Sequence, residues 1–237
     1  MKVMSFNTQH CLNYLEGKID YDIMAGAIIA LGADIVGLNE MYSEADVISD
    51  YINQTKKLSE LTGIENYYFA KAIKLPGEGA YGNGLLSKYK IVDSSTIKIP
   101  DPNPRKYSGY YETRCLLKAN LENGYTVLVC HFGLNPDEWE SAVNTILENL
   151  EEEKCILMGD FNLTPDNPAL DPIRAKMKDA ALGYCEDTPT WPSYKPEVKI
   201  DYIFVSPDIE VEYAEIPTLI ASDHRAHIAK IKFRLTK

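Results

Sequence analysis

Hydrophobic and polar positions follow two different periods along this chain, which predicts a protein built from both strands and helices. Short apolar or alternating runs rich in Val, Ile, Tyr and Phe are typical of strands. Longer segments with an apolar face, such as Asp22–Leu31 followed by Gly32, are typical of helices. Strands are predicted at residues 2–7, 33–40, 67–73, 84–87, 91–99, 114–121, 125–132, 155–161, 199–206, 210–216 and 227–235.

Further helices are predicted from the same signals. Ser43, with Asp46 three residues later, resembles a helix N-cap, so a helix is expected from Ser43 to Gly63. Another begins at Asp137 and includes residues 139–150, and a last one lies around residues 169–177.

The order of these elements predicts an α/β fold in a single domain. No linker-like change of composition and no internal repeat divides residues 1–237. The strands are too many for one sheet of ordinary size. Two sheets packed face to face, with helices outside them, would bury all the apolar faces.

Composition narrows the cellular setting. The hydrophobic content of 45% is ordinary for a globular protein, and no apolar segment approaches the roughly 20 residues that cross a bilayer. The N-terminal residues are those of a strand, without the apolar core of a signal peptide. The 5 cysteines are scattered and form no C-x-x-C pair, so we expect reduced thiols and a cytoplasmic protein.

Net charge argues against one class of partner. The chain carries 35 acidic and 24 basic side chains, a formal net charge of −11. Such a chain repels polyanions unless bound cations or a local basic face compensate. Duplex nucleic acid is therefore an unexpected partner, and nothing in the sequence predicts a protein partner.

Polar residues stand where apolar strands end, and they are the candidates for chemistry. Each alone has an ordinary structural explanation, such as a turn former or a satisfied core histidine. Together they indicate a site, because a buried acid such as Asp201 costs several kcal/mol unless a donor or a cation pairs with it. The set consists of Asn7, Glu40, His131, Asp160, Asn162, Asp201, Asp223 and His224.

Their chemical types predict how they would act. Asp201 is expected to bond one imidazole nitrogen of His224, leaving the other nitrogen for a water molecule. Glu40 and Asp223 supply the hard oxygen ligands that Mg²⁺ prefers. The amides and His131 can donate to the oxygens of a phosphoryl group.

Short motifs in a fixed order carry a resemblance to a known family. They are S-F-N at 5–7, L-N-E at 38–40, G-N-G-L-L-S from Gly82, T-R-C-L-L from Thr113, C-H-F-G-L from Cys130, G-D-F-N at 159–162, I-D-Y-I-F-V-S from Ile200 and S-D-H-R from Ser222. In this combination the chain resembles the endonuclease/exonuclease/phosphatase family of metal-dependent phosphoesterases over nearly its whole length.

The resemblance implies a four-layer α/β sandwich of two mixed sheets flanked by helices, and a role for each motif residue. It leaves open whether Asp160 or His224 takes the proton, because family members differ in this. For the metal, the resemblance implies binding by Glu40, with Asp223 at the metal side, and metal or phosphate binding by Asn7. It implies that Asp160 activates water, that Asn162 contacts the phosphate and that His224, paired with Asp201, is a base or a phosphate contact. His131 and Arg114 are placed near the site.

Two departures from the family pattern bear on substrate. Gln9 stands where the abasic-site endonucleases of the family carry aspartate, and His131 stands where they carry tyrosine. Both changes argue against a role in DNA repair.

The sequence thus predicts a hydrolase that uses Mg²⁺, with Mn²⁺ as a possible substitute, to cleave a phosphoric mono- or diester by direct attack of water. A phosphorylated small molecule or a phosphodiester is the expected substrate. One alternative is a nuclease in which the loop of residues 99–113, with Arg105, Lys106 and three tyrosines, grips a strand. Another is a binding module that kept the fold without catalysis. Trp191 is expected to be an aromatic plug over the second sheet.

Overall fold

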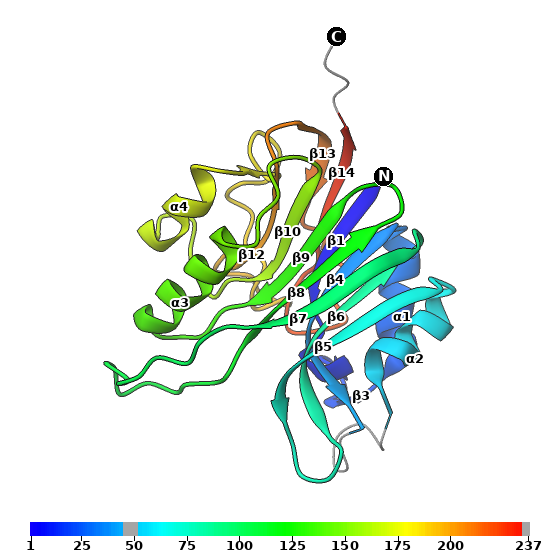
Figure 1. The fold of residues 1–237 in the computed structure, drawn as a ribbon. Helices are drawn as coiled ribbons and strands as arrows, with labels where there is room; N and C mark the ends of the chain where they lie inside the picture. Colours follow the sequence, from blue (N-terminus) through cyan, green and yellow to red (C-terminus); the bar gives the residue numbers. More distant parts are fainter. Residues whose placement is uncertain (45–51, 234–237) are drawn as a thin grey trace.

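The computed structural model describes residues 1–44 and 52–233, and it contains two six-stranded sheets packed face to face (Figure 1). The first sheet has the order β13 (Ile209–Glu215), β14 (His227–Phe233), β1 (Lys2–Asn7), β4 (Ile35–Ser43), β6 (Ala80–Ser87) and β5 (Asn66–Lys74). The second has the order β11 (Lys178–Asp179), β12 (Asp201–Val205), β10 (Cys155–Asp160), β9 (Thr126–His131), β8 (Cys115–Leu121) and β7 (Ile91–Lys98).

Both sheets are mixed, and each has one parallel pair at its centre. Strands β1 and β4 are parallel and are joined through α1 (Tyr21–Leu31), and β9 and β10 are parallel and are joined through α3 (Pro136–Leu147). All other pairs in the two sheets are antiparallel. Because parallel neighbours run in the same direction, Asn7 lies beside Asn39 in the first sheet and Asp160 lies beside His131 in the second.

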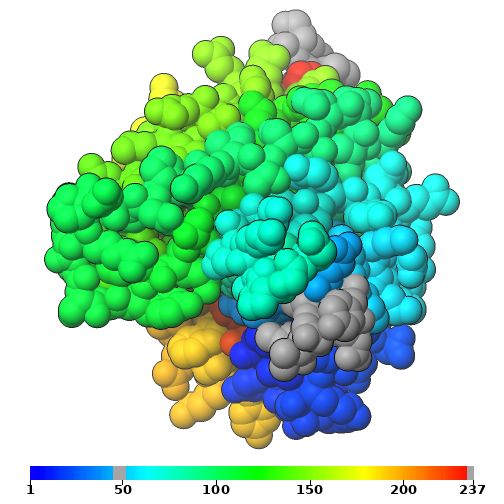
Figure 2. Space-filling view, turned by 60° about the horizontal axis from the view of Figure 1, so that its bottom comes forward, coloured from blue at the N-terminus to red at the C-terminus, as the bar shows by residue number. Residues whose placement is uncertain are grey.

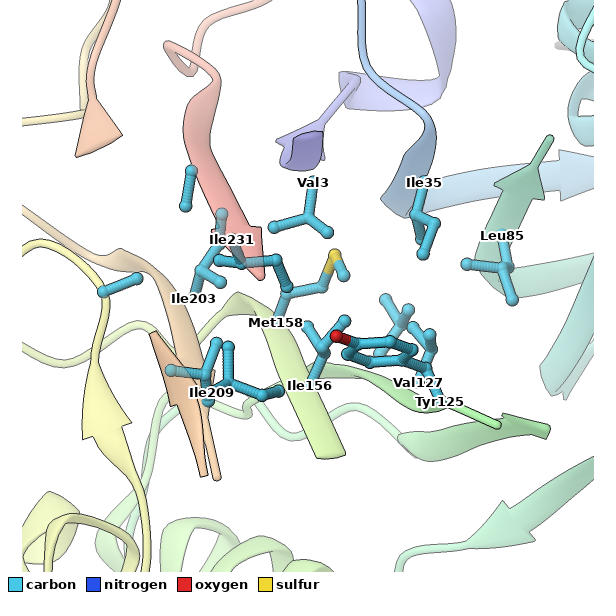
Figure 3. Close-up of a cluster of buried hydrophobic side chains, with 14 of the residues drawn as sticks. Val3, Ile35, Leu85, Tyr125, Val127, Ile156, Met158, Ile203, Ile209 and Ile231 are labelled. Carbon is cyan, nitrogen blue, oxygen red and sulfur yellow. The ribbon is translucent and has the colours of Figure 1, made fainter. Parts of the chain in front are cut away.

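The apolar side chains form three layers. One lies between the sheets, where Val3, Ile35 and Leu85 meet Met158 and Ile203 (Figure 3). A second layer joins the first sheet to α1 and α2 (Gln54–Thr62), and a third joins the second sheet to α3 and α4 (Asp171–Arg174). The order helix, sheet, sheet, helix confirms the predicted four-layer α/β sandwich.

Local capping signals mark some helix boundaries and not others. Helix α1 starts at the N-cap Asp20, whose carboxylate accepts from the backbone N–H of Ile23 at 3.1 Å, and ends at Gly32, whose φ is 65°. The predicted helix start at Ser43 is wrong, because Ser43 is the last residue of β4 and pairs with Ala80. The rest of that predicted start, including Asp46, lies outside the described residues.

Smaller elements differ from the sequence prediction. Helix α2 begins at Gln54 with Asn53 as its N-cap, and it ends at Gly63 as predicted. The helix expected around residues 169–177 is a 3₁₀ turn, Pro168–Leu170, followed by the single turn of α4. The prolines of this segment limit regular helix. The hairpin of β2 (Leu12–Asn13) and β3 (Lys18–Ile19), after a 3₁₀ turn at Gln9–Cys11, and strand β11 are too short to give a periodic signal.

Gly159 allows the close approach of β10 and β9 just before the functional edge. Its φ is 147°, and a Cβ at this position would lie 1.9 Å from the carbonyl oxygen of Cys130. We expect Gly159→Ala to lower the free energy of unfolding by about 3 kcal/mol or more, since backbone strain and a clash with main chain add. Urea unfolding monitored by circular dichroism measures this.

Gly26 provides the matched control for that substitution. It lies on the exposed face of α1, and a Cβ there would meet nothing within 4 Å. Gly26→Ala should stabilise the protein by about 1 kcal/mol, because alanine has the higher helix propensity. Equal effects of the two substitutions would contradict the strain assigned to Gly159.

Two further features concern membrane-spanning helices and the cysteines. Among the helices of the described ranges, none combines the length and apolar character that a membrane crossing requires. All five cysteines are buried free thiols, as predicted from their scatter.

Candidate active site

Three neighbouring strands of the second sheet deliver polar side chains to one edge. Strand β9 ends at His131 and β10 ends at Asp160, and the register pairs these two residues. Strand β12 runs antiparallel to β10, so its first residue, Asp201, pairs with Asp160 at the same edge. The sequence prediction treated Asp201 as an acid within a strand, and it reaches the site because the strand begins there.

Asp160 lies at the centre of this group and is almost fully buried. Its Oδ2 accepts from the amide Nδ2 of Asn7 at 3.0 Å, and it lies 3.5 Å from His131 Nε2 and 3.7 Å from His224 Nε2. Its Oδ1 accepts from the backbone N–H of Asn162 at 2.9 Å. Burial raises the pKa of Asp160 to about 7.

Asp201 and His224 form a buried pair beside Asp160. His224 Nδ1 lies 2.9 Å from Asp201 Oδ2, which leaves Nε2 of the ring facing Asp160. Burial by itself would lower the pKa of His224, but the carboxylates of Asp201 and Asp160 outweigh it and raise that pKa to about 10. The two carboxylates thus favour the charged form of the ring, with Nδ1–H donating to Asp201.

His131 is oriented by an arginine. Its Nδ1 lies 3.0 Å from the guanidinium Nη1 of Arg114. Because a guanidinium only donates, Nδ1 accepts and the ring proton is on Nε2, toward Asp160. Burial and the positive charge of Arg114 hold the pKa of His131 well below its ordinary value. Arg114 also pairs with Glu112 and lies 3.4 Å from the Tyr81 hydroxyl, so it takes part in both the site and an ion pair.

Glu40 reaches the same edge from the first sheet through a β-bulge. The register of β4 against β6 shifts between Leu38 and Met41, and Glu40 has a φ of 60°. The strand continues to Ser43 and does not end at Glu40 as the sequence predicts. Glu40 Oε1 accepts from Asn7 Nδ2 at 3.0 Å.

Hydrogen-bond donors keep Glu40 ionised. Burial alone would raise the pKa of Glu40, but His10 and the amide of Asn7 outweigh it and lower that pKa to about 2. Oε2 of Glu40 lies 3.7 Å from His10 Nδ1. A permanently ionised glutamate at the mouth of the site is a suitable ligand for a hard cation.

The predicted metal ligands Asn7 and Asp223 differ in what their side-chain oxygens contact. Asn7 turns its amide nitrogen toward Glu40 and Asp160, while its Oδ1 accepts from the backbone N–H of Gln9 at 3.0 Å, so Asn7 bridges the two acids as a donor. Asp223 is partly buried and accepts from the Ser222 hydroxyl at 3.1 Å. In the described residues, potential ligand atoms gather within 4.8 Å of one another at Asp160, Asp201 and His224.

The donor set nevertheless fits a divalent cation. Glu40, Asp160 and Asp223 line one cleft, and Asp201 lies directly behind it with a buried Oδ1 that has no hydrogen-bond partner within residues 1–44 and 52–233. Such a concentration of carboxylates is costly without compensating positive charge. Asp201 and His224 are already bonded to each other, whereas Glu40 and Asp223 line the cleft and expose carboxylate oxygens to it.

Asn39, which the sequence does not predict as a site residue, joins the two sheets beneath the site. Asn39, fully buried, accepts from the backbone N–H of Asp160 at 2.9 Å. Its Nδ2 donates to the Cys130 carbonyl at 2.8 Å and to Asn83 Oδ1 at 2.9 Å. A polar residue inside the apolar run before Glu40 was the available signal. Asn39 fixes the backbone of Asp160, so it positions the site without lining it.

These residues surround a cleft of about 570 Å³. Figure 2 faces this edge, where the green 99–113 segment, the blue N-terminal segment and the orange segment before β12 meet. Of the predicted site residues, Asn7 and Asp201 are fully buried just behind the cleft. Trp191 is 40% exposed and lines the cleft, so the expected plug over the sheet is wrong. The predicted residues that line it are Glu40, Arg114, His131, Asp160, Asn162, Asp223 and His224.

Comparison with known proteins gives a family and a set of similar folds. The profile described as the Endonuclease/Exonuclease/phosphatase family matches residues 4–224. No curated protein matches the chain. An endonuclease/exonuclease/phosphatase from Beutenbergia cavernae DSM 12333 is 20% identical, with a TM-score of 0.83 over 99% of this chain and 72% of its own.

Two similar structures have more specific descriptions. A mannosyl-6-phosphatase from Bacteroides thetaiotaomicron VPI-5482 is 17% identical, with a TM-score of 0.77 over 98% of this chain and 100% of its own. The endonuclease domain of TRAS1, a telomere-specific non-LTR retrotransposon, is 15% identical, with a TM-score of 0.59 over 100% of this chain and 99% of its own. At these identities the likeness is one of fold.

Proposed function

This chain belongs to the endonuclease/exonuclease/phosphatase family, and from that premise we propose that it is a Mg²⁺-dependent phosphoesterase of small phosphorylated molecules or phosphodiesters. The observation that carries the proposal is the position of Asp160. One oxygen of this carboxylate faces the Nε2 atoms of His131 and His224 at 3.5 and 3.7 Å and accepts from Asn7. A carboxylate so placed can accept from a water molecule beside a phosphoryl group that the two imidazoles bind.

The proposed reaction is a single displacement at phosphorus. The water oxygen forms the new P–O bond as the bond to the leaving alcohol breaks, and no covalent enzyme intermediate forms. Asp160 accepts the proton of the water, and His224, held by Asp201, donates Nε2–H to a phosphoryl oxygen. His131, with its proton on Nε2, and the amide of Asn162 donate to the remaining oxygens. The alkoxide that leaves takes a proton from solvent.

Glu40 and Asp223 are the residues that would hold the metal. When bound, Mg²⁺, or Mn²⁺ in its place, would neutralise negative charge on the phosphoryl and leaving oxygens. Mg²⁺ commonly takes one or two protein carboxylates and keeps several waters, which suits two acids at the rim of an open cleft. Asn7 holds Glu40 and Asp160 at a fixed separation through its bridging amide.

Metal dependence is the first prediction for this site. Treatment with EDTA should reduce hydrolysis to background, and added Mg²⁺ or Mn²⁺ should restore it. Glu40→Gln should raise the Mg²⁺ concentration for half-maximal activity by about 10-fold or more, because it removes a charged ligand. Isothermal titration of Mg²⁺ into the protein measures the binding directly. Glu60→Gln, at an exposed position on α2, is the control and should leave the titration unchanged.

A titration without Mg²⁺ binding would favour the rival hypothesis of a catalytically silent binding module. The filled motif positions argue against that hypothesis. The decisive functional experiment is a screen of the purified protein, with Mg²⁺ or Mn²⁺, against phosphomonoesters, phosphodiesters and oligonucleotides. Hydrolysis of none of them would refute the proposed function.

A nuclease is the second candidate, and the fold likeness to the TRAS1 endonuclease domain favours testing it. The loop expected to grip a strand is tied down, however. The Tyr111 hydroxyl and the backbone N–H of Lys106 donate to Asp137, and Arg105 packs on the Tyr111 ring. Among the described residues of this loop before Glu112, Tyr110 alone lines the cleft. Oligonucleotide binding with a steep salt dependence would support the nuclease.

The location of the protein is part of the proposal. Five free, buried thiols suit a reducing compartment. We place the enzyme in the cytoplasm on this ground.

A further inference from the structure

The cleft around Asp160 has two walls rich in aromatic and apolar side chains, one on each side of the polar centre. From this arrangement we propose that the substrate is a phosphodiester carrying a flat or apolar substituent on each side of the phosphorus. The inference rests on the proposed phosphoesterase function and narrows its substrate class. It follows from the composition of the walls, their placement and the charge between them.

The first wall consists of Tyr42, Tyr81 and Tyr110. Tyr42 and Tyr81 are register partners on β4 and β6, and their ring centroids are 5.2 Å apart. Tyr110, 68% exposed, donates its hydroxyl to Glu112 at 3.2 Å. Glu112 pairs with Arg114, which also bonds the Tyr81 hydroxyl. These bonds join the three rings into one surface on the side of the site nearest β8.

The second wall consists of Trp191, Val198 and Ile200. Trp191 and Val198 are held together by two backbone hydrogen bonds of 3.0 Å. Ile200 directly precedes Asp201 at the start of β12. In the order of the second sheet, β10 and β9 separate β12 from β8, so this wall faces the first across Asp160 and His131. A ligand centred on Asp160 would therefore contact apolar surface on both sides.

The charges of the cleft favour a singly charged phosphate. Among the described residues that line it, four are acids (Glu40, Glu112, Asp160 and Asp223) and Arg114 is the one lysine or arginine. Arg114 is already paired with Glu112. A phosphomonoester carries about −1.5 to −2 at neutral pH, whereas a diester carries one negative charge. The cleft therefore offers little fixed positive charge for a second negative charge on the ligand, which favours the diester.

A monoester would also leave one wall without a contact. Its single substituent can reach the tyrosine wall or the tryptophan wall, and the side opposite would face three charged phosphoryl oxygens. Placing those oxygens against Trp191, Val198 and Ile200 removes water from them without supplying a donor. A second ester substituent removes this conflict because it covers the same surface with carbon.

The test compares three substrates with the same leaving group in the presence of Mg²⁺: bis(4-nitrophenyl) phosphate, methyl 4-nitrophenyl phosphate and 4-nitrophenyl phosphate. We expect kcat/KM to fall in that order, with about 10-fold between the first two from stacking of the second ring. Trp191→Ala and Tyr110→Ala should each reduce the ratio of the first two several-fold. Tyr67→Ala, at an exposed position on β5 outside the cleft, should keep the wild-type ratio.

Three results would overturn the inference in different ways. If the protein hydrolyses the monoester best, and Asp160→Asn removes that hydrolysis, the phosphoesterase proposal stands and the diester preference is refuted. A ratio unaffected by both wall substitutions would refute the role of the walls. Calorimetry with the slow Asp160→Asn protein provides a binding readout, in which bis(4-nitrophenyl) phosphate should bind more tightly than 4-nitrophenyl phosphate. Hydrolysis of none of the three would refute both proposals.

Discussion

Replacing Asp160 by asparagine should lower kcat by roughly 10³-fold while the fold remains intact. The substitution keeps an acceptor for the backbone N–H of Asn162 but removes the negative oxygen that faces His131 and His224. An amide cannot accept the proton of the attacking water. Steady-state kinetics on the best substrate of the phosphoester screen measures the loss.

The control for this prediction is an aspartate on the loop that follows. Asp166 is exposed and accepts from the Thr164 hydroxyl at 2.6 Å, away from the cleft. Asp166→Asn should retain wild-type kcat. An Asp160→Asn protein with more than about a tenth of wild-type kcat would exclude Asp160 as the base.

The same substitution should not lower the thermal unfolding midpoint. Asp160 is buried near Asp201, and the desolvation of its charge, together with repulsion from Asp201, opposes folding when no cation is bound. Removal of that charge should leave the metal-free protein equally or more stable. This outcome separates a catalytic loss from a folding defect.

The residues that could be placed from the sequence are those whose neighbours in the chain determine their position. Asp160 follows an apolar run and must emerge where β10 ends, and His131 does the same on β9. The parallel pairing of these two strands then brings both to one edge. Asn39 could not be placed in this way, because it acts through hydrogen bonds to Asn83, Cys130 and Asp160, which are distant in sequence.

The aromatic walls of the cleft could not be predicted from the sequence for a related reason. Trp191 is exposed at the cleft because a local backbone bridge to Val198 turns the segment before β12 back on itself. No periodic pattern marks such a bridge. Ser43 shows the opposite failure: its local signal for a helix start was present, but pairing with Ala80 extended the strand through it. Tertiary pairing overrides a local preference worth about 1 kcal/mol.

The pairing of Asp201 with His224 predicts strongly non-additive mutations. His224→Ala should lower kcat by about 10³-fold, since it removes the donor that faces the phosphoryl group. Asp201→Asn should lower kcat by about 10²-fold, because the ring then loses the acceptor 2.9 Å from Nδ1 and with it a fixed orientation. The double variant should be no slower than His224→Ala alone.

The double-mutant cycle distinguishes two functions for Asp201. If Asp201 acts only by orienting His224, its substitution has no further effect once the ring is gone. If Asp201 instead holds a cation together with Asp160, as their closeness permits, the two losses multiply and Mg²⁺ binding weakens in the single Asp201→Asn protein. Kinetics and Mg²⁺ calorimetry on the three variants decide between these functions. The 2.9 Å bond to Nδ1, which already occupies one carboxylate oxygen, favours orientation.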